Sequence, residues 1–340
     1  MRLLVTGGAG FIGSNFIRLL YKETDHQIVC LDALTYAGNL ENLDGVKKGP
    51  RFKFVKGDLR DRELLAGLMG EKFEAVVNFA AESHVDRSIE RPADFLETNV
   101  MGAAALMDAA RAAGVKRFLQ VSTDEVYGSL GPEGLFTEAS PLEPNSPYAA
   151  SKAAADLLAR SYFVTYGFPV VITRSSNNYG PYQFPEKAVP LFVTNALEKK
   201  PLPLYGDGLH RRDWIHVEDN CRGILLALEE GRPGEVYNIG GSEELTNLEL
   251  ARTILDLTGR PHDLIKFVED RPGHDRRYAL DSTRIETELG FEREHSFKEG
   301  LAKTIEWFKS HQDWWKRIKT GEYLNYYQRM YGKRLKGPPA

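Results

Sequence analysis

The chain has 340 residues, 42% hydrophobic and 27% charged, and its 44 basic and 48 acidic side chains give a net charge of −4. This composition is typical of a folded globular protein and excludes a disordered chain, a collagen-like fibre and a coiled coil. The lack of a basic excess argues against a nucleic-acid binder, the lack of a long apolar run argues against a membrane span, and two cysteines cannot form a disulfide framework.

Short apolar runs alternate with helical patterns through the first half of the chain, as in the βαβ units of a parallel sheet. We expect strands at residues 2–6, 27–32, 51–56, 75–79, 117–122 and 170–174. We expect helices at residues 11–21, 61–69, 92–113 and 148–166. Pro92 suits a first helical turn and Gly114 suits a left-handed helix cap. The prediction is a doubly wound parallel α/β sheet.

The local composition of the sequence changes after Ser175, and proline and glycine cluster at residues 178–190 and 201–208. We therefore expect a first domain at residues 1–175 and a smaller mixed α/β lobe that takes up most of residues 176–340. Short strand patterns at residues 213–217 and 235–239 could return to the first sheet.

The segment 312–340 interleaves aromatic and basic side chains, a pattern that can bind single-stranded nucleic acid. The alternative, which we favour, is a terminal helix that packs its rings on the core while its charges stay in water. The aromatic residues include Trp314, Trp315, Tyr323, Tyr326, Tyr327 and Tyr331, and the basic residues include Lys316, Arg317, Lys319, Arg329, Lys333, Arg334 and Lys336.

A glycine-rich turn at residues 7–13 lies between the first expected strand and helix. Gly7, Gly10 and Gly13 suit a tight turn, a close approach of pyrophosphate to the backbone, and helix–strand contact. Asp32 ends the next strand, where a carboxylate accepts hydrogen bonds from a ribose 2′-hydroxyl and repels a 2′-phosphate. The pattern predicts a Rossmann-type domain that binds NAD rather than NADP. Asp58, after the third strand, could contact adenine or cap the following helix.

Tyr148 and Lys152 are four residues apart and so lie on one face of the expected helix. We expect the ammonium of Lys152 to lower the pKa of the tyrosine, which makes it a usable base for a hydroxyl proton. Directly after the fifth strand come Thr123, Asp124 and Glu125. Adjacent carboxylates can differ in protonation and so supply an acid and a base together, although in isolation they could be two solvated loop residues.

These motifs resemble the extended short-chain dehydrogenase/reductase family, and the chain resembles its dTDP-glucose 4,6-dehydratases from end to end. The matching strings lie at residues 34–39, 80–88, 122–128, 177–187, 212–214, 237–241 and 270–275. The chain departs from the family pattern at Ala33, where lysine is frequent, and at Asn220, where histidine is frequent.

The resemblance implies oxidation of dTDP-glucose at carbon 4, loss of water across carbons 5 and 6, and return of the hydride to carbon 6, so that NAD is regenerated. It implies that Tyr148, with Thr123 and Lys152, removes the proton of the 4-hydroxyl. It further implies that Glu125 removes the proton on carbon 5 and that Asp124 protonates the departing 6-hydroxyl. The product, dTDP-4-keto-6-deoxyglucose, feeds deoxysugar pathways that include rhamnose.

The resemblance also assigns binding residues. Those implied for NAD are Gly7, Gly10, Phe11, Ile12, Gly13, Asp32, Ala33, Leu34, Thr35, Asp58, Leu59, Ala80, Ala81, Thr98, Tyr148, Lys152 and Asn178. Those implied for the sugar nucleotide are Ser83, Thr123, Asn177, a nucleobase wall of Lys187 and Pro203 to Tyr205, and a diphosphate and nucleoside clamp of Arg212, Asn247, Arg271 and His274. The forked donors of arginine suit two phosphates.

We expect no metal, a cytoplasmic location, and a homodimer formed through residues 98–113 and 148–166. A nucleotide-sugar 4-epimerase is one alternative function, but an epimerase has no use for the Asp124–Glu125 pair. A dehydratase of a CDP-, GDP- or UDP-sugar is a closer alternative. A non-catalytic NAD sensor would be expected to lack Tyr148 or Lys152.

Overall fold

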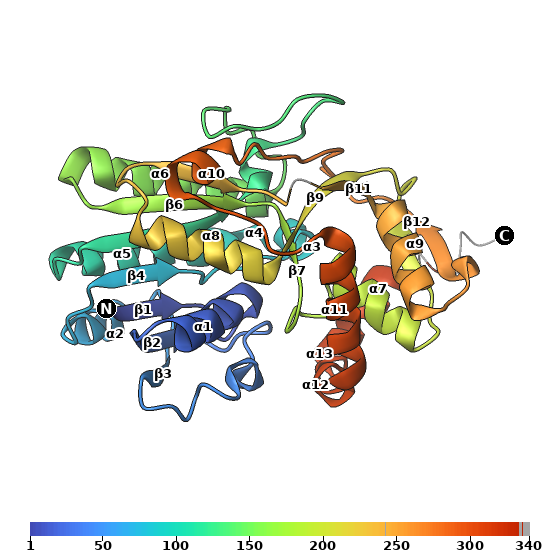
Figure 1. Cartoon of the computed structure of the whole chain (residues 1–340), viewed down its shortest axis with the longest axis horizontal. Coiled ribbons are helices and arrows are strands. Elements are labelled where there is room, and N and C mark those ends of the chain that lie inside the picture. The colour runs from blue at the N-terminus through green and yellow to red at the C-terminus, as the bar shows by residue number, and fades with distance from the viewer. Residues whose placement is uncertain (242, 333–334, 336–340) are drawn as a thin grey trace.

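The computed structural model describes residues 1–241, 243–332 and 335, and it contains a seven-stranded sheet of order β10-β6-β5-β4-β1-β2-β3 (Figure 1). All of its neighbouring strands are parallel. The strands are β1 (Arg2–Thr6), β2 (Gln27–Asp32), β3 (Phe52–Lys56), β4 (Ala75–Asn78), β5 (Arg117–Thr123), β6 (Val170–Ser175) and β10 (Val236–Ile239). The predicted doubly wound, Rossmann-type sheet is therefore confirmed.

Helices cover both faces of this sheet. On one face α1 (Phe11–Glu23) and α8 (Val217–Glu229) pack together, with α10 (Thr283–Leu289) beside them, around a core that includes Phe16, Ile17 and Ile224. On the other face α2 (Arg62–Met69), α5 (Ala103–Ala112) and α6 (Pro147–Tyr166) enclose a second core that includes Leu65 and Leu106. Because both faces are covered, most residues of the inner strands are apolar, which explains why the sequence predicted them well.

The predicted single helix over 92–113 is interrupted. The structure has α4 (Pro92–Phe95), a π-helical segment η2 (Leu96–Gly102) and then α5, and the short α3 (Val85–Glu90) precedes them. The side chain of Asn99 in η2 bonds both the backbone N–H and the carbonyl of Glu82 and also Ser151 on α6. Wider π turns are common at functional sites, and here the turn ties the loop after β4 to α6.

The second lobe has two small sheets. One is β11-β9-β7, formed by β7 (Asn177–Tyr179), β9 (Arg211–His216) and β11 (Glu244–Thr246), and the other pairs β8 (Leu202–Tyr205) with β12 (Ile265–Val268). Helices α7 (Ala188–Leu197) and α9 (Asn247–Thr258) pack beside them. The remaining short turns are η1 (Leu40–Leu43), η3 (Asp124–Tyr127) and η4 (His262–Leu264).

The return of residues 213–217 to the first sheet, expected from the sequence, is wrong. That segment forms β9, which pairs with β7 and β11, because β10 already occupies the edge of β6. The chain instead returns to the first domain through α8, the next element. The other expected return, at residues 235–239, is confirmed as β10.

The carboxyl-terminal helices α11 (Phe297–Ser310), α12 (Gln312–Ile318) and α13 (Glu322–Tyr331) lie between the main sheet and the pair α7 and α9 in the view of Figure 1. Trp314 and Trp315 are buried in the core of the second lobe, and the indole of Trp314 donates to Asn42 of the first domain at 3.0 Å. The packing interpretation is therefore confirmed for the described tail, whereas Lys333, Arg334 and Lys336 lie outside the described residues. None of the described helices is long and apolar enough to cross a membrane.

Candidate active site

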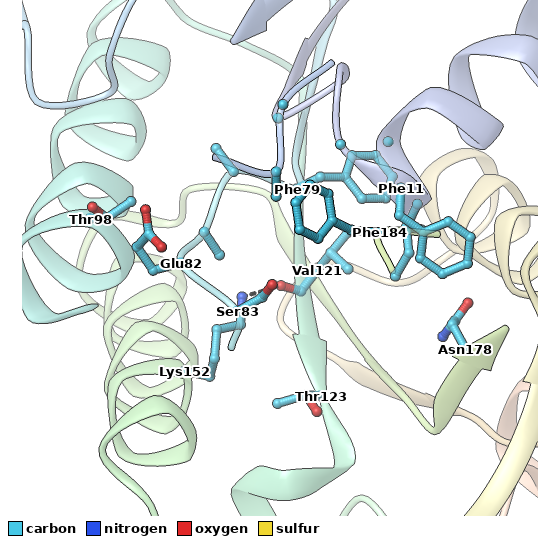
Figure 2. Close-up of a pocket in the computed structure, with 18 of the residues that line it drawn as sticks. Phe11, Phe79, Glu82, Ser83, Thr98, Val121, Thr123, Lys152, Asn178 and Phe184 are labelled. Carbon is cyan, nitrogen blue, oxygen red and sulfur yellow. Dashed lines mark hydrogen bonds between the residues drawn. The ribbon is translucent and has the colours of Figure 1, made fainter. Parts of the chain in front are cut away.

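A pocket of about 370 Å³ opens at the carboxyl ends of β1, β2, β4 and β5 and continues to β6 and β7 (Figure 2). This edge of a doubly wound sheet is where such folds bind ligands, because the connections diverge there. In Figure 2, Phe11, Phe184 and Asn178 lie on one side of the pocket and Glu82 and Lys152 on the other.

The glycine turn forms one end of this pocket and is packed too tightly for larger residues. Gly7 has a φ of +67°, and a Cβ at this position would lie 2.6 Å from the backbone N of Ala80. A Cβ at Gly13, in the first turn of α1, would lie 2.4 Å from the carbonyl O of Gly7. The amino-terminal end of α1 is therefore held close against the turn, as pyrophosphate binding requires.

We expect Gly13→Ala to weaken NAD binding by about tenfold or more, because the clashing atoms are backbone and overpacking of this kind costs roughly 1–3 kcal/mol. The measurement is the NAD dissociation constant by calorimetry. Gly67→Ala is the matched control, since Gly67 is also helical but a Cβ there would meet nothing within 4 Å. That change should leave NAD binding intact and stabilise the fold by about 0.5–1 kcal/mol.

Asp32 lies at the end of β2, and its two carboxylate oxygens accept the backbone N–H groups of Ala9 at 2.9 Å and Leu34 at 2.8 Å. Burial raises the pKa of this carboxyl, and the two backbone N–H groups oppose that shift. These hydrogen bonds fix the orientation of the carboxylate beside the pocket. Each oxygen can accept a further hydrogen bond, so a ribose diol fits there.

Tyr148 and Lys152 lie on the pocket-facing side of α6, which begins with Ser146 as its cap and Pro147 in the first turn. Both side chains are buried. The ammonium of Lys152 donates to the carbonyl of Val121 at 2.6 Å (Figure 2). The backbone of β5 therefore holds this lysine in place.

The expected fall in the pKa of Tyr148 does not occur in the structure. Burial raises the pKa of Tyr148, and the charges of Glu125 and Asp124 add to that shift, while a hydrogen bond with Thr123 opposes it. Burial lowers the pKa of Lys152 to about 8, with Asp156 opposing. These effects favour the protonated form of the phenol.

Asp124 and Glu125 form the first turn of η3, directly after β5. The Thr123 hydroxyl donates to Oδ1 of Asp124 at 3.2 Å and accepts the backbone N–H of Glu125 at 3.3 Å, and Oδ2 of Asp124 is buried without a partner in the described chain. Burial raises the pKa of Asp124 well above its usual value, and the charges of Glu125 and Asp213 raise it further.

Burial also raises the pKa of Glu125, but three cations oppose the shift: Arg271, Lys187 and Arg212. The two neighbouring carboxyls therefore differ in environment. Asp124 is favoured as a neutral acid and Glu125 as a carboxylate, which is how adjacent carboxyls are assigned separate acid and base tasks.

Nearly all the residues predicted for cofactor and catalysis line this one pocket. Of the predicted cofactor residues, only Leu34 is missing from the lining, and its backbone N–H holds Asp32. Ser83, Thr123, Asn177 and Lys187 of the predicted substrate set also line it. The predicted substrate residues outside the lining are Pro203, Tyr205, Arg212, Asn247, Arg271 and His274.

Three of these outer residues have clear partners within the chain. Arg212 is buried over the ring of Tyr278 and donates to the carbonyl of Asp275 at 2.9 Å. Arg212 and Arg271 lie close enough to Glu125 to lower its pKa. His274 bonds Asp270, so one side of its ring is already occupied.

The sequence missed several pocket residues, among them Glu82, Gln183, Phe184 and Glu186. All four lie inside strings that matched the family, but no local pattern gave them a role. Glu186 is fully buried, and burial raises its pKa to about 7.

Unpaired polar atoms in the pocket match a polar ligand. Ser122 Oγ, Asn177 Oδ1, Asn178 Oδ1 and Gln183 Oε1 are buried and have no hydrogen-bond partner in the described chain. Buried polar atoms are rarely left unpaired, so partners are expected to come from bound molecules. Together with the glycine turn and Asp32, these atoms fit a dinucleotide with a second polar ligand beside it.

Two groups of described residues, His210–Asp270–His274 and His216–Glu218–His295, bring potential metal ligands within 4.8 Å of one another. In the first group each imidazole faces one oxygen of Asp270, and the rings stack 3.8 Å apart at 13°. Burial lowers the pKa of both imidazoles, so contacts of neutral rings with the Asp270 carboxylate account for this arrangement. The absence of a metal stays a prediction.

Comparison with known proteins matches residues 4–304 to the model of the family described as GDP-mannose 4,6 dehydratase. A dTDP-glucose 4,6-dehydratase of Streptomyces niveus is 51% identical over 325 residues, which cover 94% of this chain and 96% of that protein. The crystal structure of DesIV, a dTDP-glucose 4,6-dehydratase of Streptomyces venezuelae with NAD and a second ligand bound, has a TM-score of 0.91 and 55% identity, covering 94% of this chain and all of that one.

A more distant likeness is to an NAD complex of UDP-glucose 4-epimerase from Thermus thermophilus. This structure has a TM-score of 0.85 and 33% identity, with 92% of this chain and 100% of that chain covered. The fold alone therefore does not separate dehydratases from epimerases.

Proposed function

Since the chain belongs to the GDP-mannose 4,6 dehydratase family, we propose that it is an NAD-dependent hydro-lyase that converts dTDP-glucose to dTDP-4-keto-6-deoxyglucose and water. The observation that separates it from an epimerase is the Asp124–Glu125 pair, which lines the same pocket as Tyr148 and Lys152. An epimerase moves a hydride and a proton at carbon 4 only and needs no second acid and base.

We propose that the glycine turn holds the pyrophosphate of NAD and that Asp32 holds its adenosine ribose. Asp58, Leu59, Ala80, Ala81 and Thr98 line the pocket between the turn and α6. When bound, NAD supplies a positively charged nicotinamide ring that accepts a hydride and gives it back.

The first proton transfer is assigned to Tyr148. Its phenol must release a proton before it can accept one from the sugar 4-hydroxyl, and a positive charge near the ring favours that release. Lys152, positively charged below a pH of about 8, adds to this effect, and the Thr123 hydroxyl is placed to hydrogen-bond the phenol oxygen.

The elimination is assigned to the carboxyl pair. Once carbon 4 is a ketone, the proton on carbon 5 is acidic, and the Glu125 carboxylate removes it. Asp124, held neutral by burial and by the adjacent Glu125, gives its proton to the 6-hydroxyl as water leaves. The elimination thus starts with Asp124 protonated and Glu125 ionised.

The nucleotide end of the substrate is assigned to the second lobe. Lys187 reaches the pocket from the start of α7 and donates to the carbonyl of Ser83 at 2.7 Å, so it joins the two lobes. Arg212 and Arg271 supply positive charge for the diphosphate, with Asn177 at the sugar. Pro203, Tyr205, Asn247 and His274 would form the outer wall of the nucleoside site.

The proposal is tested by incubating the protein and NAD with dTDP-glucose and identifying the product by mass and NMR. The expected product is the 4-keto-6-deoxy sugar nucleotide, without net formation of reduced nicotinamide. Accumulation of dTDP-galactose would show an epimerase instead. Equal concentrations of CDP-, GDP- and UDP-glucose test the nucleobase, because the family model is described for a GDP-sugar whereas the relative with 51% identity is described for dTDP-glucose.

We also propose that the chain works as a homodimer, with 1–175 as the cofactor domain and 176–340 mainly as the sugar-nucleotide lobe. Large apolar side chains are exposed on η2 and α6, including Leu96, Met101, Leu157 and Val164. Surfaces of this kind usually mark an interface.

The two cysteines are free and buried, which fits the proposed cytoplasmic location.

The dimer proposal predicts that Leu157→Glu yields a monomer, because a charge would be buried in the apolar interface. Light scattering after gel filtration measures the mass. Phe267→Glu is the control, since Phe267 is similarly exposed, at 57%, but lies on β12 of the second lobe, and this variant should remain a dimer. A wild-type monomer would contradict the proposal.

A further inference from the structure

A buried carboxylate outside the catalytic pocket joins the first domain to the sugar-nucleotide lobe. Asp86 lies in the first turn of α3 and is 5% exposed. Its Oδ1 accepts a hydrogen bond from Nη1 of Arg271 at 3.0 Å, and its Oδ2 accepts from the hydroxyls of Tyr205 at 3.1 Å and Tyr326 at 3.4 Å. A single carboxylate thus binds three residues from three distant segments of the chain.

The contact with Arg271 leaves most of the guanidinium available. Asp86 takes one donor of the planar group, and the buried Nε of Arg271 has no hydrogen-bond partner within the described chain. The charge of Arg271 also lowers the pKa of Glu125, so the guanidinium lies near the catalytic end of the site. Because the guanidinium is planar and rigid, a hydrogen bond to one of its N–H groups also fixes the direction of the others.

The carboxylate of Asp86 is a fixed negative charge. Burial alone would raise its pKa, but the charge of Arg271 and the hydrogen bonds from Arg271 and Tyr205 favour the carboxylate, so the pKa lies below its usual value. A largely buried guanidinium such as that of Arg271, whose side chain is 20% exposed, would be unfavourable without such a partner and would move to find another. Asp86 therefore determines where the positive charge of Arg271 lies before any ligand arrives.

The third partner, Tyr326, belongs to α13 in the carboxyl-terminal segment. Its ring lies edge-on to His84, with ring centroids 5.3 Å apart, and its hydroxyl is 3.3 Å from Nε2 of that histidine. Tyr331 of the same helix lies 3.4 Å, between hydroxyl oxygens, from Tyr205. The aromatic residues of α13 thus pack behind the nucleotide wall and not only on the core.

We propose that Asp86, aligned by Tyr326 of α13, is the positioning residue that orients Arg271 and Tyr205 to bind the nucleoside diphosphate of the substrate. This inference rests on the proposed function, since it assigns those two residues to the sugar nucleotide. Asp86 itself contacts protein groups and not the reacting atoms. If Asp86 has this role, replacing it should weaken substrate binding without an equal fall in kcat or in NAD affinity.

A purely structural role would be to fasten α13 to α3. The chain offers a matched control, because Arg329 of α13 forms an exposed ion pair with Glu90 of α3 at 2.9 Å. This pair joins the same two helices but touches neither Arg271 nor Tyr205. Arg329→Gln therefore removes this ion pair, together with a cation–π contact at 5.8 Å from the Tyr326 ring, and leaves the three hydrogen bonds of Asp86 in place.

The test compares Asp86→Asn, Tyr326→Phe and Arg329→Gln in the NAD-loaded full chain. For Asp86→Asn we expect the dissociation constant of dTDP, measured by calorimetry, and the KM for dTDP-glucose to rise by about tenfold or more. The value of kcat should stay within about threefold and NAD affinity should be unchanged. Tyr326→Phe should raise the same two constants by a few-fold, and Arg329→Gln should leave them unchanged.

Unchanged dTDP affinity in Asp86→Asn, or an equal loss in Arg329→Gln, would overturn the proposal. If Asp86→Asn does not fold, Tyr326→Phe is the deciding variant, because this change keeps the ring and removes only the hydroxyl. Unchanged dTDP affinity in Tyr326→Phe would then overturn the proposal. Wild-type protein that binds dTDP but does not dehydrate dTDP-glucose would contradict the proposed function, and the dTDP dissociation constants would still test Asp86.

Discussion

Replacing Glu125 with glutamine should leave the protein able to oxidise dTDP-glucose but unable to eliminate water. Glutamine keeps the size and hydrogen-bonding shape of the side chain but cannot accept the proton from carbon 5. Loss of a general base typically lowers the rate by about 10²–10⁴-fold. Formation of the 4-keto-6-deoxy product should fall by that factor, while one equivalent of reduced nicotinamide accumulates on the enzyme.

The two steps can be read separately in a single-turnover experiment. Absorbance of reduced nicotinamide reports oxidation at carbon 4, and product analysis by mass reports the elimination. Glu133→Gln is the matched control, because Glu133 is exposed in the loop after η3. This variant should behave as wild type. Normal turnover by Glu125→Gln would show that another group removes the proton.

The environment of Glu125 explains why it, and not Asp124, is assigned as the base. Burial raises the pKa of both carboxyls, but Arg271, Lys187 and Arg212 favour the charged form of Glu125. For Asp124 the charges of Glu125 and Asp213 oppose the charged form, and Arg212 is the cation that favours it. Removing the Glu125 charge should also lower the pKa of Asp124. The acid would then lose its proton at a lower pH than in the wild type.

The main sheet could be predicted from the sequence because its strands are covered on both faces. Runs such as Leu3–Val5 are wholly apolar and end at glycine or at a polar turn, so their bounds came within about two residues of the structure. The site residues near these strand ends followed from topology, since parallel strands bring their carboxyl ends to one edge.

The sequence was less informative where contacts between distant segments determine the strand pairing or the helix geometry. β9 reads as a strand, but its partners β7 and β11 come from separate parts of the chain on either side of it, and no local pattern shows which sheet it joins. The π turn at η2 is likewise invisible in helical spacing, because it depends on the contacts of Asn99 with Glu82 and Ser151.

The pKa shifts and charge contacts of the site were also hard to predict from the sequence. The four-residue spacing of Tyr148 and Lys152 suggested a lowered tyrosine pKa, but spacing does not show that both side chains are buried or that Lys152 donates to Val121. The contacts of Asp86 are harder still to foresee, since its partners Tyr205, Arg271 and Tyr326 are 119, 185 and 240 residues away in sequence.

Tyr148→Phe should block the reaction before the step that Glu125→Gln blocks. Without the phenol oxygen no group takes the proton of the 4-hydroxyl, so oxidation at carbon 4 itself should fall by about 10²–10⁴-fold. Neither product nor reduced nicotinamide should form. This outcome differs from that of Glu125→Gln, in which reduced nicotinamide accumulates.

The variant should fold, because phenylalanine keeps the ring that packs against Val85 and Phe95. Tyr162→Phe on the same helix is the matched control: it removes a buried ring's hydroxyl and its hydrogen bond to Asp108 at 2.6 Å, away from the pocket lining. It should retain full activity. Equal losses in the two variants would mean that the effect comes from α6 as a whole.

The same reasoning gives the role of Lys152, because the pKa of the Tyr148 phenol is raised by burial and by three acidic neighbours. Positive charge in the pocket has to offset these effects before the tyrosine can act as a base at neutral pH. Lys152→Met should therefore move the acidic limb of the kcat profile to higher pH, since the phenolate forms less readily without the ammonium. A limb that stays in place would assign Lys152 to ligand binding alone.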